Sequence, residues 1–111
     1  MNNLTNNTDA GLLACCAPIA ASTWADALDE LAIHGVVDGI SQRSGTGRMV
    51  GFAVTARHQV GELGEFDKGD FGVGQLVAAC GPGRVLMVDM AGAPISTLGG
   101  LASYAASRRP A

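Results

Sequence analysis

The stretch from Gly81 to Asp89 constrains the fold of this 111-residue chain more than any other. A Gly-Pro-Gly turn leads into an apolar run that ends on an acidic residue, and this pattern predicts a buried strand. A segment of small residues, Met90 to Ala102, follows and contains the adjacent glycines Gly99 and Gly100. A buried strand that leads into a glycine-rich loop and then a helix is a common way to build a ligand site.

The rest of the chain alternates helical and strand patterns, which predicts an α/β fold. Helices are expected from Asp9 to Pro18, from an N-cap at Ser22-Thr23 to Gly35, over Gln75–Cys80 and over Leu98–Ser107; a second strand is expected over Met49–Arg57, and a short extended piece over Val36–Ile40. Gly51 lies inside the second strand and predicts a bulge or a close backbone approach. Residues 41–47 and 58–74 are expected to be loops, and the Asn- and Thr-rich residues 1–8 a disordered tail.

Helical spacing also assigns apolar faces. Trp24, Leu28 and Leu31 share one face of the second helix, which we expect to be buried. Leu101 and Tyr104 lie with Ala105 on one side of the last helix. The cysteines, Cys15, Cys16 and Cys80, have neither disulfide nor zinc spacing and are expected to be small buried apolar residues.

Composition limits the classes of partner. The chain is 48% hydrophobic and only 15% charged, against about 25% charged in ordinary soluble domains. One small globule cannot bury that much apolar surface, which favours a homo-oligomer or a missing covalent partner, and we expect a homo-oligomer. The net charge of -3 argues against nucleic acid as a partner. The N-terminus lacks a basic signal region and no apolar run approaches about 18 residues, so we expect a cytoplasmic protein that does not bind membranes.

Several polar residues are candidates for a site, and each has a simpler alternative. Asp89 can orient a ligand or a metal-bound water, or can bond local backbone amides. Gly99-Gly100 can cradle an anion or can be a flexible turn, and Arg57 can bind an anionic substrate or form a salt bridge. The acidic loop residues Glu62, Glu65, Asp67 and Asp70 with His58 can form a metal site of hard ligands, although their spacing matches no known site and an exposed loop has the same composition.

Four segments in order carry a resemblance to a known family. They are Ser22–Asp29 with Gly35–Ile40, Val50–Arg57, Pro82–Asp89 and Gly99–Ala102. Together they resemble the RraA-like family, which includes 4-hydroxy-4-methyl-2-oxoglutarate aldolases with oxaloacetate decarboxylase activity and regulators of ribonuclease E activity. The resemblance runs from about Ser22 to Ser107, which is most of the chain.

This resemblance implies a swivelling β/β/α domain that assembles as a trimer or hexamer with active sites between subunits. Residues 9–111 would be a single domain of this type, corresponding to its N-terminal half to two-thirds. In the family, backbone amides of the loop that corresponds to Gly99, Gly100, Leu101 and Ala102 hold a pyruvate-like group, and Asp89 would support the site. Glycines let backbone N–H groups approach a carboxylate, and a helix N-terminus favours negative charge.

The implied activity is that of a lyase. It would be divalent-metal-dependent retro-aldol cleavage or decarboxylation of a pyruvate-derived 2-oxo acid, with Mg²⁺ or Mn²⁺ as the metal. The family's Arg-Asp pair, which binds substrate and metal, follows a later strand, and the 111 residues do not contain that pair. No catalytic residue and no metal ligand is therefore identified here. The alternative is a catalytically inactive family member or fragment that acts as a binding or regulatory protein.

Overall fold

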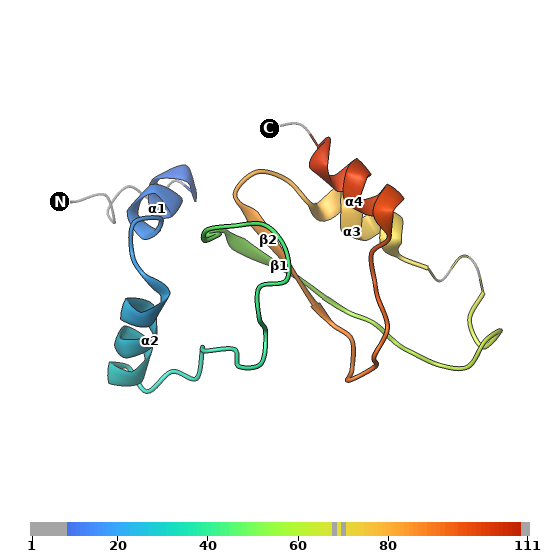
Figure 1. Ribbon diagram of the computed structural model, residues 1–111, viewed down its shortest axis with the longest axis horizontal. Helices are drawn as coiled ribbons and strands as arrows, with labels where there is room; N and C mark the ends of the chain where they lie inside the picture. Colours follow the sequence, from blue (N-terminus) through green and yellow to red (C-terminus); the bar gives the residue numbers. More distant parts are fainter. Residues whose placement is uncertain (1–8, 68, 70, 110–111) are drawn as a thin grey trace. The chain divides into compact units, whose positions relative to one another are not determined.

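A computed structural model describes residues 9–67, 69 and 71–109, whose elements run in the order α1, α2, β1, α3, β2, α4 (Figure 1). The chain divides into two units, Met1–Val50 and Gly51–Ala111. Helices combined with a parallel sheet confirm the expected α/β class. The tail expected over residues 1–8 lies outside the described residues.

The first unit contains two short helices, α1 (Asp9–Cys16) and α2 (Ala21–Glu30). The α1 helix ends shortly before Pro18, as expected of a residue that cannot continue a helix. The N-cap prediction for α2 is wrong. Its N-cap is Ala20, no described side chain caps it, and Ser22 lies within the first turn. Neither helix alone has the length and apolar character to cross a membrane; the two together meet that criterion by length and composition, with a bend of 103° between them.

The α2 helix ends in a Schellman motif centred on Ala32. The Ile33 N–H donates to the Leu28 carbonyl at 2.9 Å, and the Ala32 N–H donates to the Asp29 carbonyl at 3.1 Å. Ala32 has a φ of 56°, the left-handed conformation that glycine adopts most easily. The prediction that Gly35 ends the helix is therefore wrong; Gly35 packs against Leu28, whose Cδ1 would lie 2.9 Å from an added Cβ.

Ala32→Gly is expected to stabilise the first unit by about 0.5–1 kcal/mol, because glycine relieves the left-handed strain that alanine carries. The matched control is Ala27→Gly inside α2, which should destabilise by about 1 kcal/mol. Urea unfolding followed by the fluorescence of Trp24, the only tryptophan and part of α2, measures both. Destabilisation by Ala32→Gly would contradict this account of the helix end.

The second unit is a small β-α-β-α arrangement. The strands β1 (Phe52–Arg57) and β2 (Arg84–Asp89) pair in parallel, with Phe52 opposite Arg84 and Arg57 opposite Asp89. The crossover between them carries α3 (Val73–Ala79), and α4 (Gly100–Ser107) follows β2 and packs beside α3 (Figure 1). Both strands were predicted, and β2 begins at Arg84 and ends at Asp89 as expected.

Gly51 is a point of close backbone approach, one of the two alternatives that the sequence left open, although it precedes β1 rather than lying inside it. The Phe52 N–H donates to the Gly83 carbonyl at 2.8 Å, which draws the two chains together just before the strands begin. A Cβ at Gly51 would lie 2.9 Å from the Gly83 oxygen and 3.0 Å from Val85 Cγ2. Only a residue without a side chain fits this approach without a shift.

No described residue is buried, and this corrects the predictions of buried elements. The four central residues of β2 are half-buried, and so are the three cysteines. On the helices, Leu31 is 68% and Leu101 is 89% exposed. Nor is an extended strand formed at residues 36–40, which lie in irregular backbone with Gly39 at a φ of 81°. In the second unit the physical reason is that a sheet with two described strands is too narrow to cover the apolar faces of the elements beside it.

Candidate functional site

A cleft of about 810 Å³ lies where the two parallel strands end. It is lined by the end of β1 with the loop after it (56–64), by Phe66 and residues at the start of α3, and by Met90 and Ile95–Thr97 after β2. The carboxyl ends of parallel strands meet at one edge of a sheet, and ligands of open α/β sheets bind at that edge. The cleft is therefore the candidate site of the second unit.

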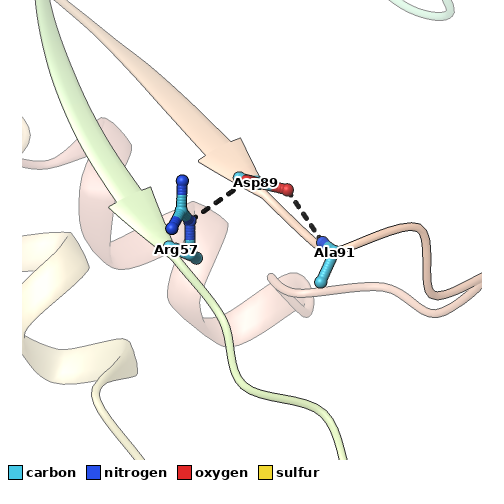
Figure 2. A network of polar contacts seen from close by, with 3 residues as sticks. All are labelled: Arg57, Asp89 and Ala91. Atoms are coloured by element: carbon cyan, nitrogen blue, oxygen red, sulfur yellow. Dashed lines mark hydrogen bonds and ion pairs between the residues drawn. The ribbon is translucent and has the colours of Figure 1, made fainter.

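An ion pair joins the last residues of the two strands. Arg57 Nε lies 3.2 Å from Asp89 Oδ2, and Asp89 Oδ1 accepts a hydrogen bond of 2.8 Å from the Ala91 N–H (Figure 2). The Arg57 side chain is 80% and the Asp89 side chain 56% exposed, so water screens the pair, and such pairs contribute at most about 1 kcal/mol. Of the alternatives given for these two residues, the structure shows a salt bridge for Arg57 and a hydrogen bond from a local backbone amide for Asp89.

A second polar pair links the end of β1 to the loop after β2. His58 Nε2 and Thr97 Oγ1 form a hydrogen bond, and both residues are half-buried and line the cleft. The His58 backbone N–H also donates to the Asp89 carbonyl at 2.9 Å, so hydrogen bonds hold both the backbone and the ring of His58. Sequence reasoning missed Thr97, because the two partners are 39 residues apart and nothing in the local sequence marks it.

The described acidic residues of the loop after His58 do not gather into a metal site. The Glu65 carboxylate accepts a hydrogen bond of 2.8 Å from the Glu62 N–H, which closes a local turn. Among residues 9–67, 69 and 71–109, no three His, Cys, Asp or Glu side chains are placed to share a metal ion. Asp70 lies outside the described residues. Both oxygens of Asp89 are engaged by Arg57 and Ala91, so the described residues at the strand ends do not fit a divalent metal.

The glycine segment expected to hold a carboxylate forms the start of α4. Gly99 is the N-cap, no described side chain caps it, and its carbonyl accepts the Ser103 N–H at 3.0 Å. A helix leaves its first N–H groups without acceptors within the helix, and here these belong to Gly100, Leu101 and Ala102. A Cβ at Gly99 or Gly100 would meet no described atom within 4 Å, so there is open space beside both glycines.

The structure thus places the predicted site residues in two locations. Asp89 lies at the strand ends with Arg57, and Gly99–Ala102 begin α4; neither Asp89 nor these four residues line the cleft. The cleft, the ion pair and the His58–Thr97 pair can bind a small molecule, and the α4 amides can bind an anion. No protein-family model matches the chain, and no curated protein and no solved structure matches it.

Proposed function

We propose that the chain is a subunit of an RraA-like lyase, with the swivelling β/β/α fold of that family, and that it binds a pyruvate-derived 2-oxo acid such as oxaloacetate. The observation that carries this proposal is the start of α4. The backbone N–H groups of Gly100, Leu101 and Ala102 lie in the first turn of α4, and no described side chain caps this helix end. Open space lies beside Gly99 and Gly100. That arrangement suits a carboxylate, which a helix N-terminus favours by about 0.3–1 kcal/mol before hydrogen bonds are counted.

Residues other than Gly100, Leu101 and Ala102 would have to supply the rest of the catalytic groups. The lyase reaction breaks a C–C bond next to the 2-oxo group and leaves the enolate of pyruvate. The resemblance implies that Mg²⁺ or Mn²⁺ takes part, whereas the described residues near Asp89 do not fit such an ion. Sites between subunits, which the family also implies, would let a neighbouring chain of a trimer or hexamer contribute the metal ligand.

A second candidate function is binding without catalysis. The engagement of Asp89 by Arg57 and by the Ala91 amide favours it, because the one carboxylate at the described strand ends is already neutralised. In that case the chain would bind a 2-oxo acid and act as a regulatory protein.

Pyruvate release from oxaloacetate separates the two functions. We expect a rate in the presence of Mg²⁺ that exceeds the rate with Mg²⁺ alone. Gly100→Pro removes one amide donor at the first helical position, where proline is tolerated, and the extended Gly99 (φ −90°, ψ −177°) accommodates it. This variant should raise the KM for oxaloacetate about two- to tenfold, the value of one lost hydrogen bond.

Gly100→Ala is the control, since it keeps the N–H group and adds only a methyl in open space. Equal KM values for the two variants would argue against the amide cradle. A rate no higher than that of the metal alone would eliminate the lyase function, and calorimetric titration with oxaloacetate would then test the binding function.

A further inference from the structure

We propose that the cleft at the strand ends binds a second small molecule, which is uncharged and has an aromatic or alkyl body with one hydrogen-bonding head. The first argument is the cleft's lining. Apolar side chains line much of it, namely Val60, Leu63, Phe66, Phe71, Leu76 and Ile95. Sites for small organic ligands are of this kind, mostly apolar with a few polar groups, and span about 300–1,000 Å³, a range that includes 810 Å³.

The polar groups of the cleft suit a single neutral head. His58 and Thr97 are both half-buried and already oriented by their mutual hydrogen bond. Together they offer a ring nitrogen and a hydroxyl, which can donate and accept. Ser96, the neighbouring lining residue, donates its hydroxyl to the Leu98 carbonyl at 3.2 Å, which helps to order this side of the cleft.

The charges of the lining argue against an anionic ligand. Among the lining residues that the structure describes, Arg57 and Glu62 alone carry a formal charge at pH 7 with histidine neutral, and their signs are opposite. Arg57 is paired with Asp89 and largely exposed, so an incoming anion would have to compete with an existing carboxylate in screened surroundings. A neutral ligand has no such competition.

This second molecule is distinct from the 2-oxo acid of the proposed function. The amides proposed for that carboxylate begin at Gly100. In the segment that follows β2, the last residue that lines the cleft is Thr97. Binding in the cleft therefore does not depend on the lyase function, and the two proposals can fail separately.

Phenol is a suitable probe, with benzoate as its anionic counterpart of similar size. We expect phenol, followed by ¹H–¹⁵N correlation spectra of the full chain at pH 7, to shift the amide signals of the lining glycines Gly61, Gly64 and Gly72 in a saturable way. The signals of Gly39 and Gly47, in the first unit, serve as the internal reference and should not move.

Thr97→Val removes the hydroxyl at nearly constant volume and should weaken phenol binding about two- to tenfold. Thr55→Val, on the exposed face of β1 and outside the lining, is the matched control and should change nothing. Thr97→Ser keeps the hydroxyl and should bind phenol like the unmodified chain, which separates loss of the head contact from loss of structure.

Three results would overturn the proposal: no saturable shift, equal shifts across the reference glycines, or equal effects of Thr97→Val and Thr55→Val. Tighter binding of benzoate than of phenol, abolished by Arg57→Gln, would also overturn it and would make the occupant an anion. Arg84→Gln, at the opposite end of the same sheet, controls for the loss of one positive charge.

Discussion

Replacing Gly51 with valine is expected to disrupt the pairing of β1 with β2 and to destabilise the second unit by at least about 1–3 kcal/mol. The added Cβ would lie 2.9 Å from the Gly83 oxygen and 3.0 Å from Val85 Cγ2. The Gly83 oxygen is backbone and accepts the Phe52 N–H at 2.8 Å, so it cannot retreat without loss of that hydrogen bond. Within the described residues the sheet has two strands, so no further strand maintains the register.

Amide hydrogen exchange of Val85 to Val88 measures this loss directly, because these residues lie within β2. Gly81→Ala is the matched control. Gly81 precedes β2, and an added Cβ there would meet no described atom within 4 Å. It should leave stability within about 0.5 kcal/mol. Equal acceleration of exchange by both variants would mean that the close approach at Gly51 does not hold the sheet together.

The same residue illustrates what the sequence could predict. A glycine inside an apolar run has few explanations, and close backbone approach was one of the two given for Gly51. The strand over Arg84–Asp89 was equally predictable, because its apolar run lies between a turn and an acidic residue. Local chemistry at α2 was more ambiguous. Ser22 and Thr23 have the side chains of N-caps, yet Ala20 takes that position.

Burial could not be predicted in this way. Helical spacing shows which residues share a face, and Leu101 with Ala105 do so four residues apart on α4. It does not show whether another element covers that face, and in the described chain Leu101 is 89% and Tyr104 61% exposed. Sequence reasoning assigned the faces and then assumed a layer to cover them.

The candidate site likewise has a part that local sequence predicts and a part that depends on contacts between distant segments. The Gly99-Gly100 turn and Asp89 are visible in the sequence because they depend on a few neighbouring residues. The His58–Thr97 pair and the cleft depend on contacts between segments 39 residues apart, and no local pattern encodes them. The register of β1 and β2 brings Arg57 to Asp89, although each residue was a separate candidate in the sequence.

Self-association is the remaining expectation, and the exposed face of α4 offers a place to test it. We expect the chain to elute as a trimer or hexamer in size-exclusion chromatography with light scattering. Burial of a leucine side chain is worth about 1.5–3 kcal/mol, so an exposed leucine that is covered by a neighbouring subunit strengthens association about 10- to 100-fold. Leu101→Asp, which removes that gain and adds a charge that must be desolvated, should dissociate the assembly.

Ser103→Asp is the matched control, because it places the same charge on an exposed residue of the same helix that is not apolar. It should leave the assembly intact, since an aspartate near a helix N-terminus is favourable in itself. Equal dissociation by both variants would point to the added charge rather than to the apolar face. A monomer for the unmodified chain at all concentrations would contradict the oligomer outright, and with it the proposal that a neighbouring subunit completes the lyase site.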